Sequence, residues 1–288
     1  MRLARDGGRT ALARRFASQP WGAVQVARPD ASGVPEVVLT NPGGGTLGGD
    51  RLELTVEVGP GARATVCTQG ATKVYRGAQA VQRTRLGVGE GGVLEHVPHH
   101  VIPFAASRWR QETVIDLAPD ARLLAWEAFS AGRLARGERF AFAGLASRTL
   151  LLRGGAPVAV DGCELAGGGE PFGGWAYLAT AYVVAPGDLG ALAEELHELL
   201  AARGPATSAS TGTPRRDVPG EQLIGSAGTP RRDAPGAQLL GSASTPQEGV
   251  LCARLLAASA PALTAVLNAL RDRVRPTLGL GPVAREVV

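Results

Sequence analysis

The chain has little of several features that would mark a particular class of protein. It contains one lysine, Lys73, among 30 basic residues, only three cysteines, and 5% aromatic side chains. Cys67, Cys163 and Cys252 are far apart and form no Cys-x-x-Cys motif, so the sequence predicts neither a disulfide framework nor a zinc knuckle. The basic residues are dispersed and lack interleaved aromatics, which argues against nucleic-acid binding despite a net charge of +4.

Long apolar runs are also missing. The first residues are charged throughout and lack the apolar core of a signal peptide, and no stretch approaches the roughly 20 apolar residues that span a bilayer. We therefore expect a cytoplasmic protein with reduced thiols and no membrane partner. The Gly-x-Ser-x-Gly and His-Glu-x-x-His motifs of common hydrolases are absent, so no catalytic class is indicated.

The most informative stretch is residues 41–77, where glycine-rich turns frame regular strands. Apolar and polar residues alternate strictly over residues 51–58, which predicts a half-buried strand with Leu52, Leu54, Val56 and Val58 on its buried side. The glycines at 43–45 and 48–49 precede this strand rather than a helix, so a phosphate-binding loop is not predicted. A flexible entry loop and a backbone surface shaped for a partner or an ion both remain open.

A loose repeat follows, with a period of about 30 residues. The segments VEVGPGARATV (56–66), LGVGEGGVLEHV (86–97) and IDLAPDARLLAW (115–126) each place a tight turn between two apolar arms. Hairpins too small to bury their own faces predict stacked strands in a β-helix-like body, with a plain antiparallel sandwich as the alternative. Further strands are expected at residues 22–27, 36–39, 139–152, 156–160 and 175–184, with turns at 154–155 and 161–162.

The hydrophobic period changes after residue 186, which sets the expected division of the chain. Residues 1–186 are predicted to form a β-rich body, and residues 187–288 a small β-α-β-α portion packed on it. Asp188 and Ser259 are expected to cap its two helices, with a strand at residues 250–256. Residues 205–248 contain the tandem duplication GTPRRDVPGEQLIGSA and GTPRRDAPGAQLLGSA, whose proline, glycine and serine content predicts a disordered insertion.

One dense group of metal-binding side chains occurs in GVLEHVPHHVIPF (92–104), where His96, His99 and His100 accompany Glu95. Imidazole suits nickel, zinc and copper. The alternative is an exposed strand edge. Four scattered carboxylates could line a polar passage, or could instead be solvated or paired with arginine: Asp50, Glu53, Glu127 and Glu138.

Together these motifs resemble the urease accessory protein family UreD, also called UreH. The similarity is carried by GRTALARRF (8–16), by NPGGGTLGGDRLELTVEVGPGARATVCTQGATKVYR (41–76), by residues 93–140 and by VLCARLLA (250–257). The resemblance implies a β-rich stack of strands with two helices. It also implies a scaffold, not an enzyme, that binds apo-urease with UreF and the GTPase UreG so that nickel reaches the urease active site.

The resemblance further implies nickel as a cargo in transit through an internal polar tunnel, and it leaves a dimeric accessory complex open. It makes five residues candidates for nickel passage: Asp50, Glu127, Glu138, His99 and His100. Eight residues become candidates for partner binding: Gly48, Gly49, Thr68, Gly70, Thr72, Lys73, Tyr75 and Arg76. The pair His99-His100 departs from the polar pair usual in the family. An alternative function is a β-solenoid enzyme acting on an extended carbohydrate-like ligand, with two carboxylates about 5–10 Å apart in a cleft.

Overall fold

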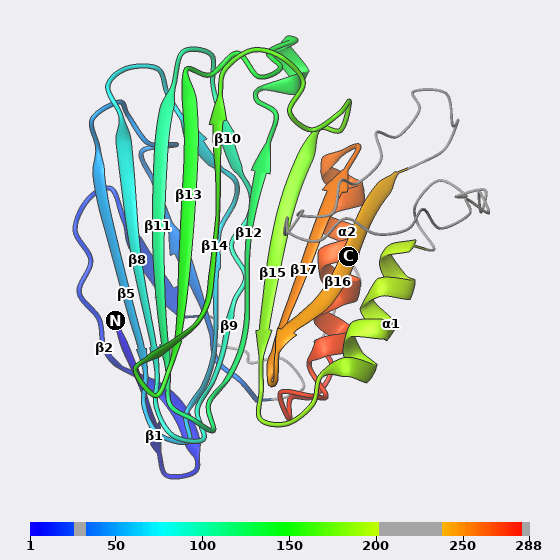
Figure 1. Cartoon of the computed structure of the whole chain (residues 1–288). Helices are drawn as coiled ribbons and strands as arrows, with labels where there is room; N and C mark the ends of the chain where they lie inside the picture. Colours follow the sequence, from blue (N-terminus) through cyan, green and yellow to red (C-terminus); the bar gives the residue numbers. More distant parts are fainter. Residues whose placement is uncertain (26–32, 202–237, 284–288) are drawn as a thin grey trace, which may run out of the picture.

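The computed structural model of the chain describes residues 1–25, 33–201 and 238–283 (Figure 1). Strands dominate it and lie in two facing sheets, and two helices cover the outer face of one of them. This confirms the predicted mainly β, β-helix-like body with a C-terminal portion that carries two helices. No helix in the described ranges is long and apolar enough to cross a membrane.

Sheet A has seven strands within the described residues, in the order β14-β13-β11-β8-β5-β1-β2. Their bounds are β1 (Arg2–Asp6), β2 (Arg9–Arg14), β5 (Arg51–Val58), β8 (Ala80–Val88), β11 (Arg108–Leu117), β13 (Gly144–Arg153) and β14 (Ala156–Ala166).

Sheet B follows the order β16-β17-β15-β12-β9-β6-β4-β3, and β10 and β7 pair beside β12. Its strands are β3 (Gly22–Gln25), β4 (Glu36–Thr40), β6 (Arg63–Thr68), β7 (Thr72–Val74), β9 (Val93–His96), β10 (Val101–Pro103), β12 (Arg122–Ser130), β15 (Tyr177–Val184), β16 (Leu239–Gln247) and β17 (Val250–Ala257). The helices are the short 3-10 helix η1 (Leu134–Arg136), α1 (Gly190–Ala201) and α2 (Ala260–Val274).

Each predicted repeat contributes one strand to each sheet. β5, β8 and β11 pair in parallel in sheet A, and β6, β9 and β12 pair in parallel in sheet B. The predicted hairpins were therefore wrong in their pairing. The two strands of a repeat do not pair with each other; each pairs with the equivalent strand of the next repeat. The turns stack in the same way: the Gly61 N–H donates to the Glu90 carbonyl (2.8 Å), and the Gly91 N–H donates to Asp120 Oδ1 (3.0 Å).

Buried hydrophobic clusters hold these layers together. The predicted apolar side of β5 is buried between the sheets, with Val56 fully covered. A second core lies between sheet B and the helices, where Leu196 of α1 and Leu270 of α2 are fully buried. Both predicted caps are confirmed: Ser259 Oγ accepts from the Ala262 N–H (3.3 Å), and Asp188 Oδ1 accepts from the Gly190 N–H (2.9 Å).

Two local predictions were wrong. The expected turn at residues 161–162 lies inside β14, where Asp161 and Gly162 stay in register with Thr149 and Arg148 of β13. Strand β16 occupies residues 239–247 of the expected disordered insertion at 205–248, because Leu239 is buried and the segment pairs with β17. The part of the insertion at residues 205–237 lies outside the described residues.

Candidate functional site

A belt of polar side chains crosses the space between the two sheets. On the inward face of sheet A, adjacent strands align Gln82, Gln111, Ser147 and Cys163 in one row, and Thr84, Thr113, Thr149 and Asp161 in the next. The rows on the far side of the threonines are apolar, with Leu86, Ile115 and Leu151 buried. The solenoid interior is thus polar at one level and apolar at the next.

Sheet B supplies the opposite wall of this polar belt. We include in the belt its inward-facing residues at the same level: Thr68, His96, Glu127, Thr180 and Arg254. Glu127, Thr180 and Arg254 are register partners on β12, β15 and β17. Burial lowers the pKa of His96 to about 4, so its imidazole is neutral at physiological pH.

Glu127 joins the two walls of the belt. It is 8% exposed and accepts hydrogen bonds from Ser147 Oγ (2.5 Å) and Gln111 Nε2 (3.0 Å), both on sheet A. Burial raises the pKa of Glu127 to about 7; the hydrogen bond from Ser147 opposes this rise, and the charge of nearby Asp161 adds to it. Glu127 can therefore exchange a proton near neutral pH.

A cavity of about 40 Å³ lies between the sheets along the belt, lined by Glu127, His96, His99 and Gln111 among others. At roughly 10–15 Å³ for each water position, it has room for about three waters or a partly hydrated ion. Among the described residues, no three His, Cys, Asp or Glu side chains are close enough to hold a metal ion. The belt offers amide and hydroxyl oxygens beside one carboxylate, which suits passage better than tight binding.

A second cavity, of about 180 Å³, lies between α2 and the loop before β10 and is lined by Glu36, Cys67, His99 and His100. His99 lines both cavities, and Trp126, whose Nε1 donates to the Pro98 carbonyl (2.8 Å), forms part of the wall between them. Burial lowers the pKa of His100 to about 4, and its ring meets Tyr177 edge-on at 5.2 Å.

Glu127, His99 and His100 thus line two neighbouring cavities, whereas Asp50 and Glu138 line neither. Asp50 Oδ2 accepts from the Leu47 N–H (2.8 Å) and closes the glycine-rich turn. Glu138 pairs with Arg133 and accepts from the Ala105 N–H (3.2 Å) in the loops near η1. Each of these two carboxylates has a local structural role in this conformation.

The predicted partner-binding residues gather where two loops meet at one end of the solenoid. Gly48 lies so close to Gly77 that a Cβ atom on Gly48 would be 2.6 Å from the Gly77 Cα, and Gly49 has a φ of 90°. Tyr75 packs edge-on against Phe104 at 5.0 Å, while Lys73 and Arg76 are exposed. Four of the predicted residues line a third cavity, of about 300 Å³: Thr68, Gly70, Thr72 and Lys73.

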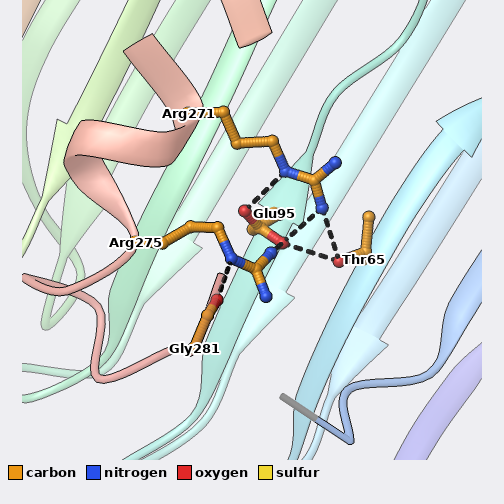
Figure 2. Close-up of polar contacts among 5 residues, drawn as sticks. All are labelled: Thr65, Glu95, Arg271, Arg275 and Gly281. Atoms are coloured by element: carbon orange, nitrogen blue, oxygen red, sulfur yellow. Dashed lines mark hydrogen bonds and ion pairs between the residues drawn. The ribbon is translucent and has the colours of Figure 1, made fainter. Parts of the chain in front are cut away.

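Glu95 faces away from the belt. It accepts from Arg271 Nε (2.8 Å), from Arg275 and from Thr65 Oγ1 (2.7 Å), and so ties α2 to β6 and β9 (Figure 2). Burial alone would raise the pKa of Glu95, but the two guanidinium groups and Thr65 lower it below the usual value. Glu95 is therefore separated from His96, because the two side chains alternate to opposite faces of β9.

Several belt residues were missed at the level of sequence, notably Gln111, Ser147, Asp161 and Arg254. A signal for some of them is present in the repeats. Gln82-x-Thr84-x-Leu86, Gln111-x-Thr113-x-Ile115 and Ser147-x-Thr149-x-Leu151 place two polar residues before an apolar one at inward positions. Asp161 and Arg254 lack this signal, because they come from antiparallel strands outside the repeat.

The fold and the belt define a β-solenoid protein with an enclosed polar layer. A family profile described as UreD urease accessory protein matches residues 1–287. The urease accessory protein UreD of Sorangium cellulosum (strain So ce56) is 42% identical over 206 residues, which cover 70% of this chain and 64% of that protein. UreD of Anaeromyxobacter sp. (strain Fw109-5) is 38% identical over 208 residues, covering 69% of each chain.

UreD of Dechloromonas aromatica (strain RCB) is 41% identical over 140 residues, which cover 48% of this chain and 49% of that protein. The matched stretch therefore spans about half of one relative and nearly two thirds of another. The chain belongs to the UreD urease accessory protein family.

Proposed function

We propose that this protein is a urease maturation factor that binds apo-urease together with UreF and the GTPase UreG in the cytoplasm, and that the polar belt carries nickel towards the urease active site. The observation that carries the proposal is the position of Glu127: a carboxylate with a pKa of about 7, bridging the two sheets beside a small cavity. Membership of a family described as urease accessory proteins supports the maturation role.

The belt has the chemistry that a transit route needs. Nickel accepts carboxylate, imidazole and water ligands, and a route must release the ion at its end. The neutral imidazole of His96 and the oxygens of Gln111, Ser147 and the threonine row can each replace part of a hydration shell. Nickel is a cargo in this proposal and not a resident cofactor.

An enzyme acting on carbohydrate gains little support from the same residues. The belt cavity, at about 40 Å³, is far below the roughly 300 Å³ of common ligand pockets. A wider hollow of about 580 Å³ on the outer face of sheet A has Glu112 on its rim. Hydrogen bonds from Arg110 and Arg83 lower the pKa of Glu112, the reverse of the shift that a general acid requires.

The maturation role is tested by co-expressing urease subunits with UreF and UreG, with and without this chain. We expect urease purified without the chain to contain little nickel and to show little activity, and a tagged chain to capture the other three components. Equal nickel content in the two preparations would refute the proposed function. If the tagged chain captures the other components but the nickel content of urease does not change, the chain binds them without taking part in nickel loading.

A further inference from the structure

The polar belt extends towards the edge of the solenoid formed by β14 and β16, where Asp161 of β14 and Arg254 of β17, the strand next to β16, form an ion pair. Asp161 belongs to sheet A and Arg254 to sheet B. Seven other ion pairs of the described residues lie inside one sheet, in loops, or at the helices. The pair of Asp161 and Arg254 differs from these because it joins the two sheets.

Exposure rises steadily along this end of the belt. Glu127 is 8% exposed, the Asp161 side chain 21%, and the Arg254 side chain 51%. Arg254 Nε donates to Thr180 Oγ1 (3.3 Å), and Thr180 is the register partner of Glu127. A small ion that moves outward from Glu127 on this side would meet Asp161 first and then the guanidinium group.

Both oxygens of Asp161 are already occupied. Arg254 binds Oδ1, and the Tyr182 hydroxyl donates to Oδ2 (2.7 Å). Burial alone would raise the pKa of Asp161, but these two partners hold it below its usual value, so the carboxylate is ionised at neutral pH. An ionised carboxylate near Glu127 is a suitable second ligand for a divalent cation, and here a fixed positive charge occupies it.

We propose that Asp161 is a cation ligand of the belt that Arg254 keeps closed: with the ion pair formed, the guanidinium group repels a divalent cation, and with Arg254 turned out to solvent, Asp161 and Glu127 bind the cation together. Tyr182 holds Asp161 in place for either partner. Arg254 is half exposed, so its side chain can leave without opening the apolar core. This inference rests on the proposed cation passage and adds a control point to it.

The test is a calorimetric titration of the purified full-length chain with Ni²⁺ at pH 7.5. Arg254→Gln removes the competing charge, so we expect Ni²⁺ to bind about tenfold more tightly than to the wild type. Tyr182→Phe keeps Arg254 on Asp161, so the block remains and the Ni²⁺ affinity is expected to stay within about twofold of the wild type. The double variant Arg254→Gln/Asp161→Asn should lose the gain entirely.

Arg83→Gln is the matched control. Arg83 is similarly exposed and also forms an ion pair, with Glu112, but it lies on the outer face of sheet A. The Ni²⁺ affinity of the Arg83→Gln variant should stay within about twofold of that of the wild type. The inference is overturned if Arg254→Gln does not bind Ni²⁺ more tightly than the wild type, or if the gain survives in Arg254→Gln/Asp161→Asn.

The outcome separates this inference from the proposed function. A gain in Ni²⁺ affinity by the isolated chain, together with urease that loads normally without the chain, would support the gate and refute the maturation role. An unchanged affinity, together with a strict need for the chain during urease loading, would refute the gate and leave the maturation role intact.

Discussion

Ser147 of sheet A donates its hydroxyl to Glu127 of sheet B across 2.5 Å, so a hydrogen bond to a titratable carboxylate spans the middle of the solenoid. The contact places a group with a pKa of about 7 between two layers that also share a buried apolar core. Glu127 therefore contributes both to the stability of the fold and to the chemistry proposed for the polar belt.

The first prediction concerns stability against pH. The pKa of Glu127 is raised from about 4.5 in the unfolded chain to about 7 in the folded one, so the folded state holds a proton that the unfolded state releases. The contribution of Glu127 to the free energy of unfolding should therefore fall from pH 4.5 to pH 7 and stay constant above. Relative to Glu127→Gln, the wild type should lose on the order of 3 kcal/mol over this range, measured by urea unfolding.

Glu53→Gln provides the control for that series, because Glu53 is exposed on the outer face of β5. Because this side chain is exposed, its removal should change the free energy of unfolding by no more than about 0.5 kcal/mol. Parallel curves for the wild type and Glu127→Gln would show that Glu127 titrates normally in the folded state.

The second prediction concerns the buried cluster shown in Figure 2. Glu95→Ala removes the acceptor for Arg271 and Arg275, so a loss of about 3–5 kcal/mol in the free energy of unfolding is expected at pH 7. The pKa of Glu95 is lowered in the folded state, so its contribution is present above the unfolded pKa and disappears as pH falls through the folded value.

Thr65→Val is the milder comparison in this cluster. It removes a hydroxyl that donates to Glu95 at 2.7 Å and should cost about 1 kcal/mol in chemical denaturation. If Glu95→Ala were no more harmful than Thr65→Val, the cluster would not be what anchors α2 to sheet B.

The third prediction concerns backbone contact in the glycine-rich loop. Gly48→Ala would bring a methyl group within 2.6 Å of the Gly77 Cα, so the loops must separate, and a loss of about 1–3 kcal/mol is expected. Gly70→Ala is the matched control, since no heavy atom lies within 4 Å of a Cβ placed there. Thermal unfolding should distinguish the two, and equal melting temperatures would contradict the packing described.

The fourth prediction concerns the exposed cations at the same end. If this surface binds a partner, Lys73→Glu/Arg76→Glu should weaken capture of the other maturation components, with the effect reduced at high salt because exposed charges are screened. Arg85→Glu, an exposed arginine on the outward face of β8, should leave capture unchanged. Equal capture by both variants in a pull-down at low salt would exclude this surface.

Much of the fold could be predicted because its signals are local. Alternation over residues 51–58, the turns of the repeats and the caps at Asp188 and Ser259 each depend on neighbouring residues alone. The pairing of the repeats could not be predicted from neighbouring residues. A strand of one repeat pairs with the equivalent strand of the next repeat, which is distant in the sequence. Strand β16 was hidden by its composition, because its order depends on pairing with β17 and on the burial of Leu239, which are distant contacts.

The candidate site was only partly predictable. Glu127, Asp50 and Glu138 were named from the sequence as possible lining of a polar passage, and the family resemblance kept all three as candidates. The structure places Glu127 in the belt, whereas Asp50 and Glu138 hold loops together. No local signal separates these three carboxylates, because the difference between them is which face of which strand or loop they occupy. The ion pair of Asp161 and Arg254 joins residues 93 positions apart and is visible only in the folded chain.

The most direct test of the account is the nickel content of urease matured with Glu127→Gln in place of the wild-type chain, with UreF and UreG present. The account predicts that the complex assembles normally, that nickel per urease active site falls several-fold, and that the Glu53→Gln control matches the wild type. Full nickel loading with Glu127→Gln would contradict the claim that the polar belt carries the ion.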